Sequence, residues 1–277
     1  MPKSVAGAES RSYLPRFFML LRLSATQLVR APSHSRRGAA ARRLARHTLL
    51  AVAIGSALIV ALMVAFDATE IGLMPPRGSP DLWPARILTD FGKDAYVLSL
   101  LAAALVVMAL AGPLLHGAAR AWLMRLGTQV QFLFLAVLCP VLLGEVVKWF
   151  VGRGRPFVGG KANPFNFAPF SGTEAYFSFP SSHAVTSFAL AFAVGSIWPR
   201  ARVAMFIYAL LIAGTRLVLL AHHPSDVVGG ALIGTLGAMA VRYWFAARRL
   251  GFAIRTNGEI VPLWGRLKRV APRASAS

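Results

Sequence analysis

Three short polar clusters interrupt an otherwise apolar chain. The first is KWFVGRGRP at 148–156, the second is FPSSH at 179–183, and the third is TRLVLLAHHPSD at 215–226. Together they contain lysine, arginine, serine, histidine and aspartate. Cations and hydroxyl groups bind oxyanions, and histidine transfers protons near neutral pH. The clusters therefore suggest one site that binds an anion and performs acid–base chemistry on it.

The cations of these clusters lie in apolar surroundings, where an uncompensated charge is costly. They are Lys148, Arg155 and Arg216, and the nearby acids, Glu145 and Asp226, are too few to neutralise them. A basic side chain can also snorkel to the headgroup region, and this would explain one of the cations singly. Snorkelling fits Arg216 poorly, because a histidine and an aspartate follow that residue. We therefore expect a bound phosphate or another oxyanion.

The second cluster supplies backbone donors. A proline followed by Ser181 and Ser182 at the start of an apolar run predicts a helix N-terminus, with capping hydroxyls and free N–H groups. The helix dipole makes such an end a ready anion site. Serine is common at helix starts, so the cluster gains weight only from His183 and the cations nearby.

The third cluster pairs a histidine with a carboxylate. His222 and Asp226 lie four residues apart, and Pro224 is placed to open a helix. The carboxylate could take the Nδ1 proton of His222 and leave Nε2 free as a nucleophile. His183 would then be the general acid that protonates the leaving oxygen.

A metal site is the competing interpretation of the same residues. Two histidines and one aspartate could ligate zinc, but three nearby cations would oppose a divalent ion. We therefore expect neither a metal nor any other cofactor. The remaining histidines are expected to be interfacial or solvated polar residues; they are His34, His47, His116 and His223.

The clusters resemble, in order and spacing, the signature of the type 2 phosphatidic acid phosphatase family, which includes vanadium haloperoxidases. That signature reads K-x6-RP, then PSGH, then SR-x5-H-x3-D. The matching residues here are Lys148 with Arg155-Pro156, then Pro180-Ser181-Ser182-His183, then Thr215-Arg216 with His222 and Asp226.

The resemblance implies a metal-independent lipid phosphate phosphatase with a six-helix membrane fold. By it, His222 is the nucleophile, His183 the acid and Asp226 the orienting group. The phosphate cradle implied by the resemblance consists of Lys148, Arg155, Ser181, Ser182 and Arg216.

Two residues depart from the family signature. Ser182 stands where the family usually has glycine, which allows a closer approach of backbone to phosphate. Serine at a helix start still presents its N–H, so we expect an altered site that remains active. Thr215 replaces serine and keeps the hydroxyl group.

Composition identifies an integral membrane protein. The chain has 277 residues, of which 56% are apolar and 14% charged, with a mean hydropathy of +0.59. Soluble domains carry about a quarter charged residues. A membrane-spanning helix needs about 20 predominantly apolar residues. Uncharged runs predict six such helices, at 48–66, 95–116, 126–144, 184–199, 203–215 and 227–241.

These runs predict an all-α, six-transmembrane-helix bundle as a single domain over 48–245. The last three runs are short, and they become adequate only when polar residues at their ends lie at the interface or face the interior. Residues 1–47 form a basic N-terminal segment, and residues 246–277 a basic tail, expected to be disordered after Pro262.

The distribution of basic residues predicts the topology. Cytoplasmic connections are enriched in Lys and Arg. The termini and alternate turns contain 22 of these residues and the other face contains 8. Both termini are therefore expected in the cytoplasm, with the bacterial inner membrane as the location. All three clusters then fall at the extracytoplasmic face, which is a reason independent of their chemistry to treat them as one site.

The N-terminal segment has two interpretations. Its apolar run 17–21 is cut by Arg22 and is too short to span a membrane. Leucine, phenylalanine and arginine together favour a helix on an anionic leaflet, so anionic lipids at the cytoplasmic face are expected partners. An arginine-rich segment with few acids also resembles an organellar transit peptide.

The excess of positive charge does not indicate a nucleic-acid partner, because the basic residues lie between apolar segments and form no soluble basic face. The single cysteine, Cys139, excludes a disulfide framework and a thiolate metal cluster. The sequence carries no signal of oligomeric state.

The substrate class follows from the position of the site and from the resemblance. The aromatic connection 157–179 could contact acyl or prenyl chains, or it could only pack at the interface. A lipid phosphate is expected, and the family makes undecaprenyl pyrophosphate, phosphatidylglycerophosphate, phosphatidic acid and a lipid A phosphate all candidates. The alternatives are a lipid phosphotransferase using the same histidine and a non-enzymatic anion transporter. The chain lacks the paired repeats typical of transporters.

The topology can be tested by cysteine labelling in a Cys139→Ser background. The variants Ser79→Cys and Ser171→Cys should react with an impermeant thiol reagent in intact cells, because both positions fall on the face with few basic residues. The variant Ser275→Cys should not react. Reversed labelling would place the three clusters in the cytoplasm.

Overall fold

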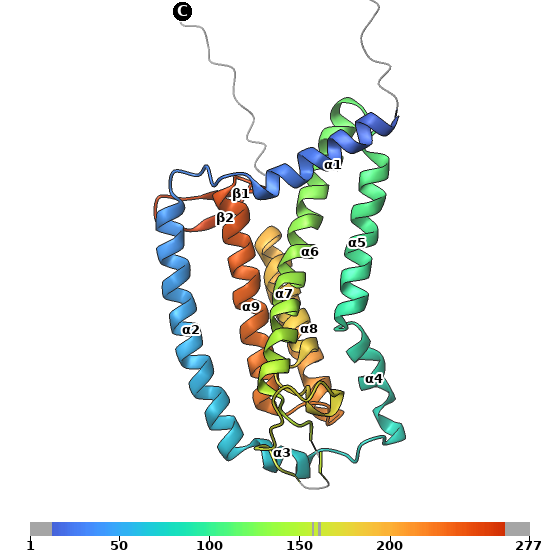
Figure 1. Cartoon of the computed structure of the whole chain (residues 1–277), viewed down its shortest axis with the longest axis vertical. Coiled ribbons are helices and arrows are strands. Elements are labelled where there is room, and N and C mark those ends of the chain that lie inside the picture. The colour runs from blue at the N-terminus through green and yellow to red at the C-terminus, as the bar shows by residue number, and fades with distance from the viewer. Residues whose placement is uncertain (1–12, 157, 160–161, 264–277) are drawn as a thin grey trace, which may run out of the picture.

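Long helices lie side by side along one axis in the computed structural model, which describes residues 13–156, 158–159 and 162–263 (Figure 1). The helices are α1 (Tyr13–Val29), α2 (Arg37–Ala65), α3 (Asp67–Leu73), α4 (Trp83–Asp90), α5 (Asp94–Ala111), α6 (Gly117–Val151), α7 (Ser182–Ile197), α8 (Arg202–Val218) and α9 (Pro224–Ala247). Two strands, β1 (Phe252–Ile254) and β2 (Ile260–Pro262), form an antiparallel hairpin.

Five helical stretches of the described chain are long and apolar enough to cross a membrane. They are α2, the stretch Pro80–Ala111 that includes α4 and α5, α6, the stretch Pro199–Val218 that includes α8, and α9. The apolar helix α7 has 16 residues and is shorter. Each of the six predicted runs falls largely within a helix, and the all-α membrane class is confirmed. Five of the six predicted spans meet the length requirement.

The helix α7 lies at the centre of the bundle, packed against α6, α8 and α9. Two glycines of α9 permit this packing. A Cβ on Gly230 would lie 2.5 Å from the backbone oxygen of Ser181, and one on Gly234 would collide with that of Val185. The two backbones therefore approach more closely than any larger residue would allow. The result is that the N-terminal half of α7 has a fixed position relative to α9.

The C-terminal hairpin was not predicted from the sequence, which suggested only a basic tail from residue 246. The rings of Phe252 and Phe132 lie 4.9 Å apart in an edge contact, and both residues are fully buried. Apolar burial of this kind holds the hairpin on the end of the bundle. The predicted disorder after Pro262 concerns residues that are almost all outside the described part of the chain.

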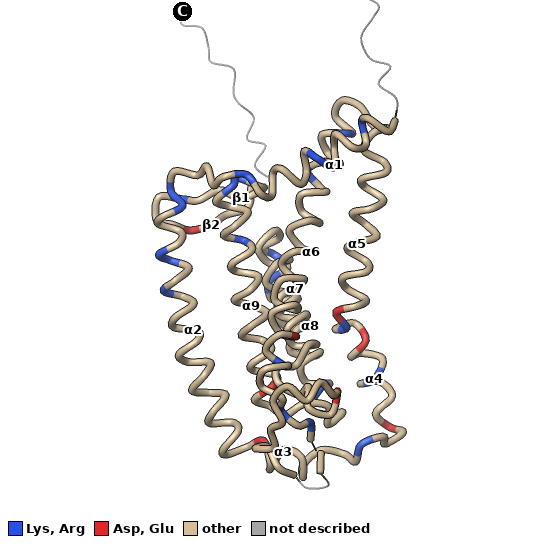
Figure 2. Tube along the Cα trace, viewed as in Figure 1, with Lys and Arg blue, Asp and Glu red and all other residues tan. Residues whose placement is uncertain are grey.

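Charge is unevenly distributed along the long axis of the bundle. Figure 2 shows basic residues gathered at the end that carries α1 and the hairpin, whereas the acidic residues lie mostly toward the other end. The helix α1 crosses the basic end, and the indole of Trp244 donates to the Leu28 carbonyl at 3.0 Å. The sequence predicted a helix in this segment, and its place on a lipid leaflet stays a prediction. The helix α2 begins at Arg37, well before the predicted span at residue 48.

The close contact between α7 and α9 can be tested with one substitution at two sites. Gly234→Ala should lower the unfolding temperature in detergent, because overpacking against backbone costs about 1–3 kcal/mol. Gly214→Ala in α8 is the matched control, since no atom lies within 4 Å of the position its Cβ would take. It should leave the protein as stable or more stable, by up to about 1 kcal/mol. Equal effects of the two substitutions would contradict this account of the packing.

Candidate active site

The three polar clusters meet at the end of the bundle opposite α1. The first follows α6, the second begins α7, and the third joins α8 to α9. Hydrogen bonds connect all three. The Ser181 amide donates to the Asp226 carbonyl at 3.1 Å, and the Ser178 amide donates to the Arg153 carbonyl at 3.0 Å. The prediction that segments far apart in sequence form one site is thus in agreement with the arrangement of the backbone.

His222 is buried in the turn between α8 and α9. Its Nδ1 lies 2.8 Å from the carbonyl oxygen of Ser178. A carbonyl can only accept a hydrogen bond, so Nδ1 must be the ring nitrogen that carries the proton. In the neutral ring, Nε2 then holds a free lone pair. Burial, followed by the positive charges of Arg216 and Arg155, lowers the pKa of His222 well below its ordinary value and keeps the ring neutral.

The expected hydrogen bond between His222 and Asp226 is absent from this geometry. The nearest carboxylate oxygen of Asp226 lies 4.0 Å from Nδ1, beyond hydrogen-bond distance. The predicted tautomer is nevertheless the one that the ring adopts, because the Ser178 carbonyl takes the place assigned to the carboxylate. The expected partner of Nδ1 therefore differs from the one in the structure, because the Asp226 carboxylate is taken up by Arg153, the Ser178 hydroxyl and the His223 amide.

Asp226 instead positions the loop that contacts His222. Its carboxylate accepts hydrogen bonds from the Ser178 hydroxyl at 2.6 Å and from the His223 amide at 2.9 Å. The second of these bonds belongs to a capping box at the start of α9. Asp226 therefore acts on His222 through Ser178, whose hydroxyl it binds and whose carbonyl holds the imidazole.

The charge of Asp226 is balanced by Arg153, which is 1% exposed. The guanidinium lies 2.6 Å from a carboxylate oxygen of Asp226 and 2.8 Å from one of Asp67. Asp67 also accepts hydrogen bonds from the amide and hydroxyl of Ser225. The sequence indicated no role in the site for either Arg153 or Asp67. A pair separated by 86 positions leaves no local pattern, and only the unusual burial of both charges identifies it.

Lys148 of the predicted cradle is held at the start of α7. Its ammonium group lies 2.5 Å from the carboxylate of Glu145 and also donates to the Ser182 hydroxyl. Ser182 is the residue that departs from the family signature. Its side chain therefore adds a contact to the lysine that glycine would not provide.

The two arginines of the predicted cradle are only partly engaged by protein. Arg155 donates from Nε to the Glu174 carbonyl at 3.0 Å, and burial lowers its pKa. Arg216 donates from Nη1 to the Thr89 hydroxyl at 2.8 Å. The residue Thr89 belongs to α4, which the sequence analysis did not connect with the site. Each guanidinium keeps further N–H groups for a ligand.

Several buried polar atoms at this end have no hydrogen-bond partner among the described residues. They include the Ser181 hydroxyl, His183 Nε2 and Arg216 Nε, together with both carboxyl oxygens of Glu70 and both ring nitrogens of His223. Buried polar groups are nearly always paired, and an unpaired one in a native structure calls for an explanation. A phosphate oxygen would satisfy the donors among them. Ser181, His183 and Arg216 are residues that the sequence assigned to the site, whereas Glu70 and His223 are not.

The described residues contain no group of three or more His, Cys, Asp or Glu placed to hold a metal ion. The absence of a metal requirement stays a prediction. Aromatic residues of the connection that follows α6 lie near the end of this helix: the ring of Phe170 lies 4.7 Å from that of Trp149, and Phe165, Phe167 and Phe170 are exposed.

Comparison with known proteins adds an independent observation. A family model described as the PAP2 superfamily matches residues 129–250, which contain all three clusters. A lipid A 1-phosphatase of Rhizobium johnstonii is 34% identical over 217 residues, 77% of this chain and 86% of that protein. The chain belongs to the PAP2 superfamily. The family resemblance found in the sequence is confirmed, and the protein is a membrane phosphatase, that is, a phosphoric ester hydrolase.

Other PAP2 relatives differ in how much of the chain they cover. A lipid A 1-phosphatase of Rhizobium etli is 32% identical over 76% of this chain and 88% of its own length. A phosphatidylglycerophosphatase B of Escherichia coli is 39% identical, but over 28% of this chain and 32% of its own. No solved structure matches the chain.

The distinct positions of Arg153 and Arg155 generate a prediction about stability. Arg153→Met should destabilise the fold severely, because removing one partner of a buried ion pair costs about 3–5 kcal/mol. Arg155→Met is the matched control two residues away, and Arg155 makes no ion pair within the described part of the chain. It should unfold close to the wild-type temperature and raise KM for a phosphate substrate. Thermal unfolding in detergent together with steady-state kinetics would measure both effects, and similar unfolding temperatures for the two variants would contradict the assignment.

Proposed function

We propose that this PAP2 phosphatase hydrolyses a lipid phosphate without a metal, through a phosphohistidine intermediate on His222. The observation that carries the proposal is the hydrogen bond from His222 Nδ1 to the Ser178 carbonyl. It leaves Nε2 unprotonated in a buried ring surrounded by cations, which is the state a nitrogen nucleophile needs.

The reaction proceeds in two displacements. In the first, Nε2 of His222 attacks phosphorus, an N–P bond forms, and the P–O bond to the lipid breaks while His183 donates a proton to the leaving oxygen. In the second, water attacks the phosphohistidine, gives a proton to His183, and inorganic phosphate leaves. The binding groups are Lys148, Arg155, Arg216 and the backbone at Ser181 and Ser182, which neutralise the phosphoryl oxygens without a divalent ion.

The unpaired nitrogen of His183 supports its role as the acid. Its Nε2 has no partner in the described structure, and the ring lies at the first turn of α7, where the dipole favours negative charge on a ligand. Gly92 of the turn before α5 brings backbone against this ring, since a Cβ there would lie 3.4 Å from His183 Cδ2.

We place the site at the extracytoplasmic face and count α7 as a sixth crossing. Sixteen helical residues span about 24 Å, and the polar segments at both ends supply the remainder of a bilayer core. The basic end with α1 and the hairpin then faces the cytoplasm. The bacterial inner membrane is the location that this arrangement fits.

Lipid A 1-phosphate is the substrate that we infer. The relatives that cover more than three quarters of the chain carry the name lipid A 1-phosphatase, whereas the phosphatidylglycerophosphatase covers 28%. The longer match includes segments outside the catalytic clusters, where the features that select a lipid would lie. A transfer of the phosphoryl group from His222 to a second lipid uses the same first step and remains the alternative.

Phosphate release from purified lipids tests the function. Lipid A should be hydrolysed faster than phosphatidylglycerophosphate, phosphatidic acid and undecaprenyl pyrophosphate.

Activity should survive excess chelator, because cations of the protein neutralise the phosphate, and vanadate should inhibit as a mimic of the five-coordinate phosphorus. Loss of activity on chelation with recovery on adding a divalent ion would overturn the metal-independent mechanism. Phosphate appearing only on an added acceptor lipid would identify a phosphotransferase.

The roles of the two histidines are separable by leaving group. His222→Ala should abolish both turnover and any trapped phosphohistidine. His183→Ala should slow hydrolysis of a lipid monophosphate by about 10²–10⁴-fold, the usual contribution of a general acid. Its effect on p-nitrophenyl phosphate should be clearly smaller, because nitrophenolate leaves without a proton.

Asp226→Asn serves as the comparison for a positioning residue. It should slow both substrates by a similar factor, because it disturbs the loop that holds His222 in every turnover. A phosphoenzyme that persists in His222→Ala, or equal losses for His183→Ala on both substrates, would overturn the assignment of roles while leaving the family assignment intact.

A further inference from the structure

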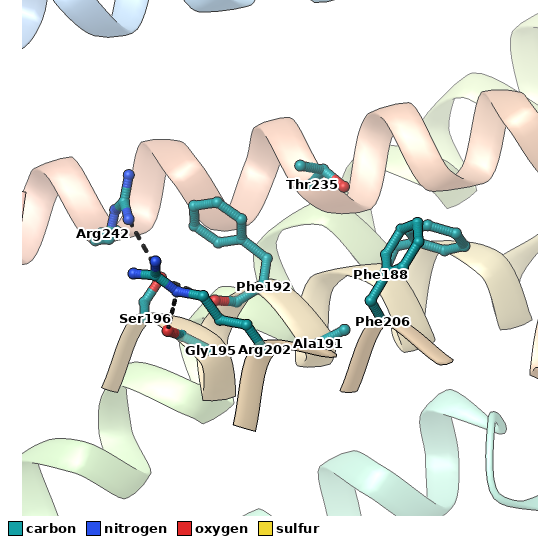
Figure 3. Close-up of a pocket in the computed structure, with 9 residues that line it drawn as sticks. All are labelled: Phe188, Ala191, Phe192, Gly195, Ser196, Arg202, Phe206, Thr235 and Arg242. Carbon is teal, nitrogen blue, oxygen red and sulfur yellow. Dashed lines mark hydrogen bonds between the residues drawn. The ribbon is translucent and has the colours of Figure 1, made fainter. Parts of the chain in front are cut away.

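A second set of cations lies at the other end of α7, α8 and α9. Arg202 and Arg242 line a cavity of about 510 Å³ together with the rings of Phe188, Phe192 and Phe206 (Figure 3). The figure shows the two guanidinium groups near each other at one side and the rings of Phe188 and Phe206 at the other. The cavity is therefore amphiphilic, with a basic end and an apolar end.

The same two arginines also line a neighbouring polar cavity of about 160 Å³. Its other walls include Arg43 and His47 of α2 and Glu259 of the hairpin. Arg202 and Arg242 thus stand where an apolar groove between helices opens to a polar region at the basic end of the bundle. This is the geometry of a boundary between acyl chains and headgroups.

Arg242 is poorly paired for a cation in this position. Its Nε is buried without a hydrogen-bond partner among the described residues, and its Nη1 reaches the Ser196 hydroxyl only at 3.4 Å. The guanidinium lies 4.7 Å from the centre of the Phe192 ring. An unpaired buried charge is costly. The guanidinium of Arg242 therefore calls for an anionic partner.

The surroundings do not supply that partner. Arg202 donates from Nε to the Gly195 carbonyl at 3.0 Å, and the described structure gives neither arginine an ion pair. Glu259 is the acidic residue among the described residues that line the two cavities. Its carboxylate is already engaged by Arg255 at 2.8 Å. Arg43, Arg202 and Arg242 therefore have only one carboxylate nearby among the described lining residues, and that carboxylate is already paired.

We propose that this cavity binds an anionic phospholipid of the leaflet opposite the active site. The lipid phosphate lies between Arg202 and Arg242, and one acyl chain fills the groove lined by Phe188 and Phe206. A free phosphate would leave the apolar groove empty, and a neutral lipid would leave the guanidinium groups unpaired. A phospholipid with net negative charge satisfies both ends. The site contains no residue of the catalytic cluster, so the proposal does not rest on the proposed function.

Native mass spectrometry of the full chain in neutral detergent tests the proposal. Phosphatidylglycerol should bind with one tight site, and zwitterionic phosphatidylcholine and uncharged diacylglycerol should bind more weakly. Glycerol 3-phosphate, which has the phosphate without chains, should not displace the lipid. The double substitution Arg202→Gln/Arg242→Gln should weaken phosphatidylglycerol binding about 30-fold, as expected for two basic residues at a lipid surface.

Two further variants keep the test decisive. Arg125→Gln is the matched control, since Arg125 is an exposed arginine of α6 that lines neither cavity, and it should bind the lipid as the wild type does. Thr235→Trp fills the groove and leaves both arginines in place, so it should also lose the lipid. If the double variant does not fold, as judged by thermal unfolding, Thr235→Trp carries the test. Equal affinity for phosphatidylcholine, displacement by glycerol 3-phosphate, or lipid binding by Thr235→Trp at the wild-type level would overturn the proposal.

Discussion

The active end of the bundle depends on one buried cation. Arg153 contacts Asp67 from α3 and Asp226 from α9, so a single guanidinium joins the segment after α6 to two distant helices. A buried ion group of this kind is costly to desolvate and is stable only when every charge is paired. Glu70 is a third buried carboxyl group close to this cluster. Burial, with Asp67 and Asp226 nearby, raises its pKa to about 7. Near neutral pH it is therefore protonated about half of the time, which reduces the repulsion.

This arrangement explains why Asp226 does not form a hydrogen bond with His222, the proposed nucleophile. Asp226 is fully occupied by Arg153, the Ser178 hydroxyl and the His223 amide. It still lies 4.0 Å from His222 Nδ1. At that distance a unit charge is worth about 1 kcal/mol in water and about 4 kcal/mol at an effective dielectric constant of 20. In the mechanism proposed above, the carboxylate therefore stabilises the positive imidazole of the phosphohistidine electrostatically, while the Ser178 carbonyl fixes the orientation of the ring.

The parts that sequence predicted are those with a local signature. The apolar runs are local and coincide with helices, and Pro224 opens α9 as expected. The partners that position them are not local: Asp67 lies at the start of a short helix, and nothing in its neighbours indicates that it meets Arg153. The hairpin at Phe252 was missed because its strands have three residues each, within a segment that the sequence identified only as a basic tail. Hydropathy also does not locate the end of a helix such as α2, which begins at Arg37. The helix continues beyond the apolar run, and its additional turns contain charged residues.

Cations lie near both ends of the part of the bundle formed by α7, α8 and α9, and the two ends differ in how charge is balanced. At the catalytic end, Glu145 neutralises Lys148, and part of each arginine is already bonded to protein. Such partial compensation weakens the binding of free phosphate, which a phosphatase must release at each turnover. At the opposite end, Arg202 and Arg242 face a carboxylate that Arg255 has already taken. An anion bound there does not compete with an unpaired carboxylate. The geometry therefore suits a permanently bound ligand at this end and a ligand that is released at each turnover at the other end.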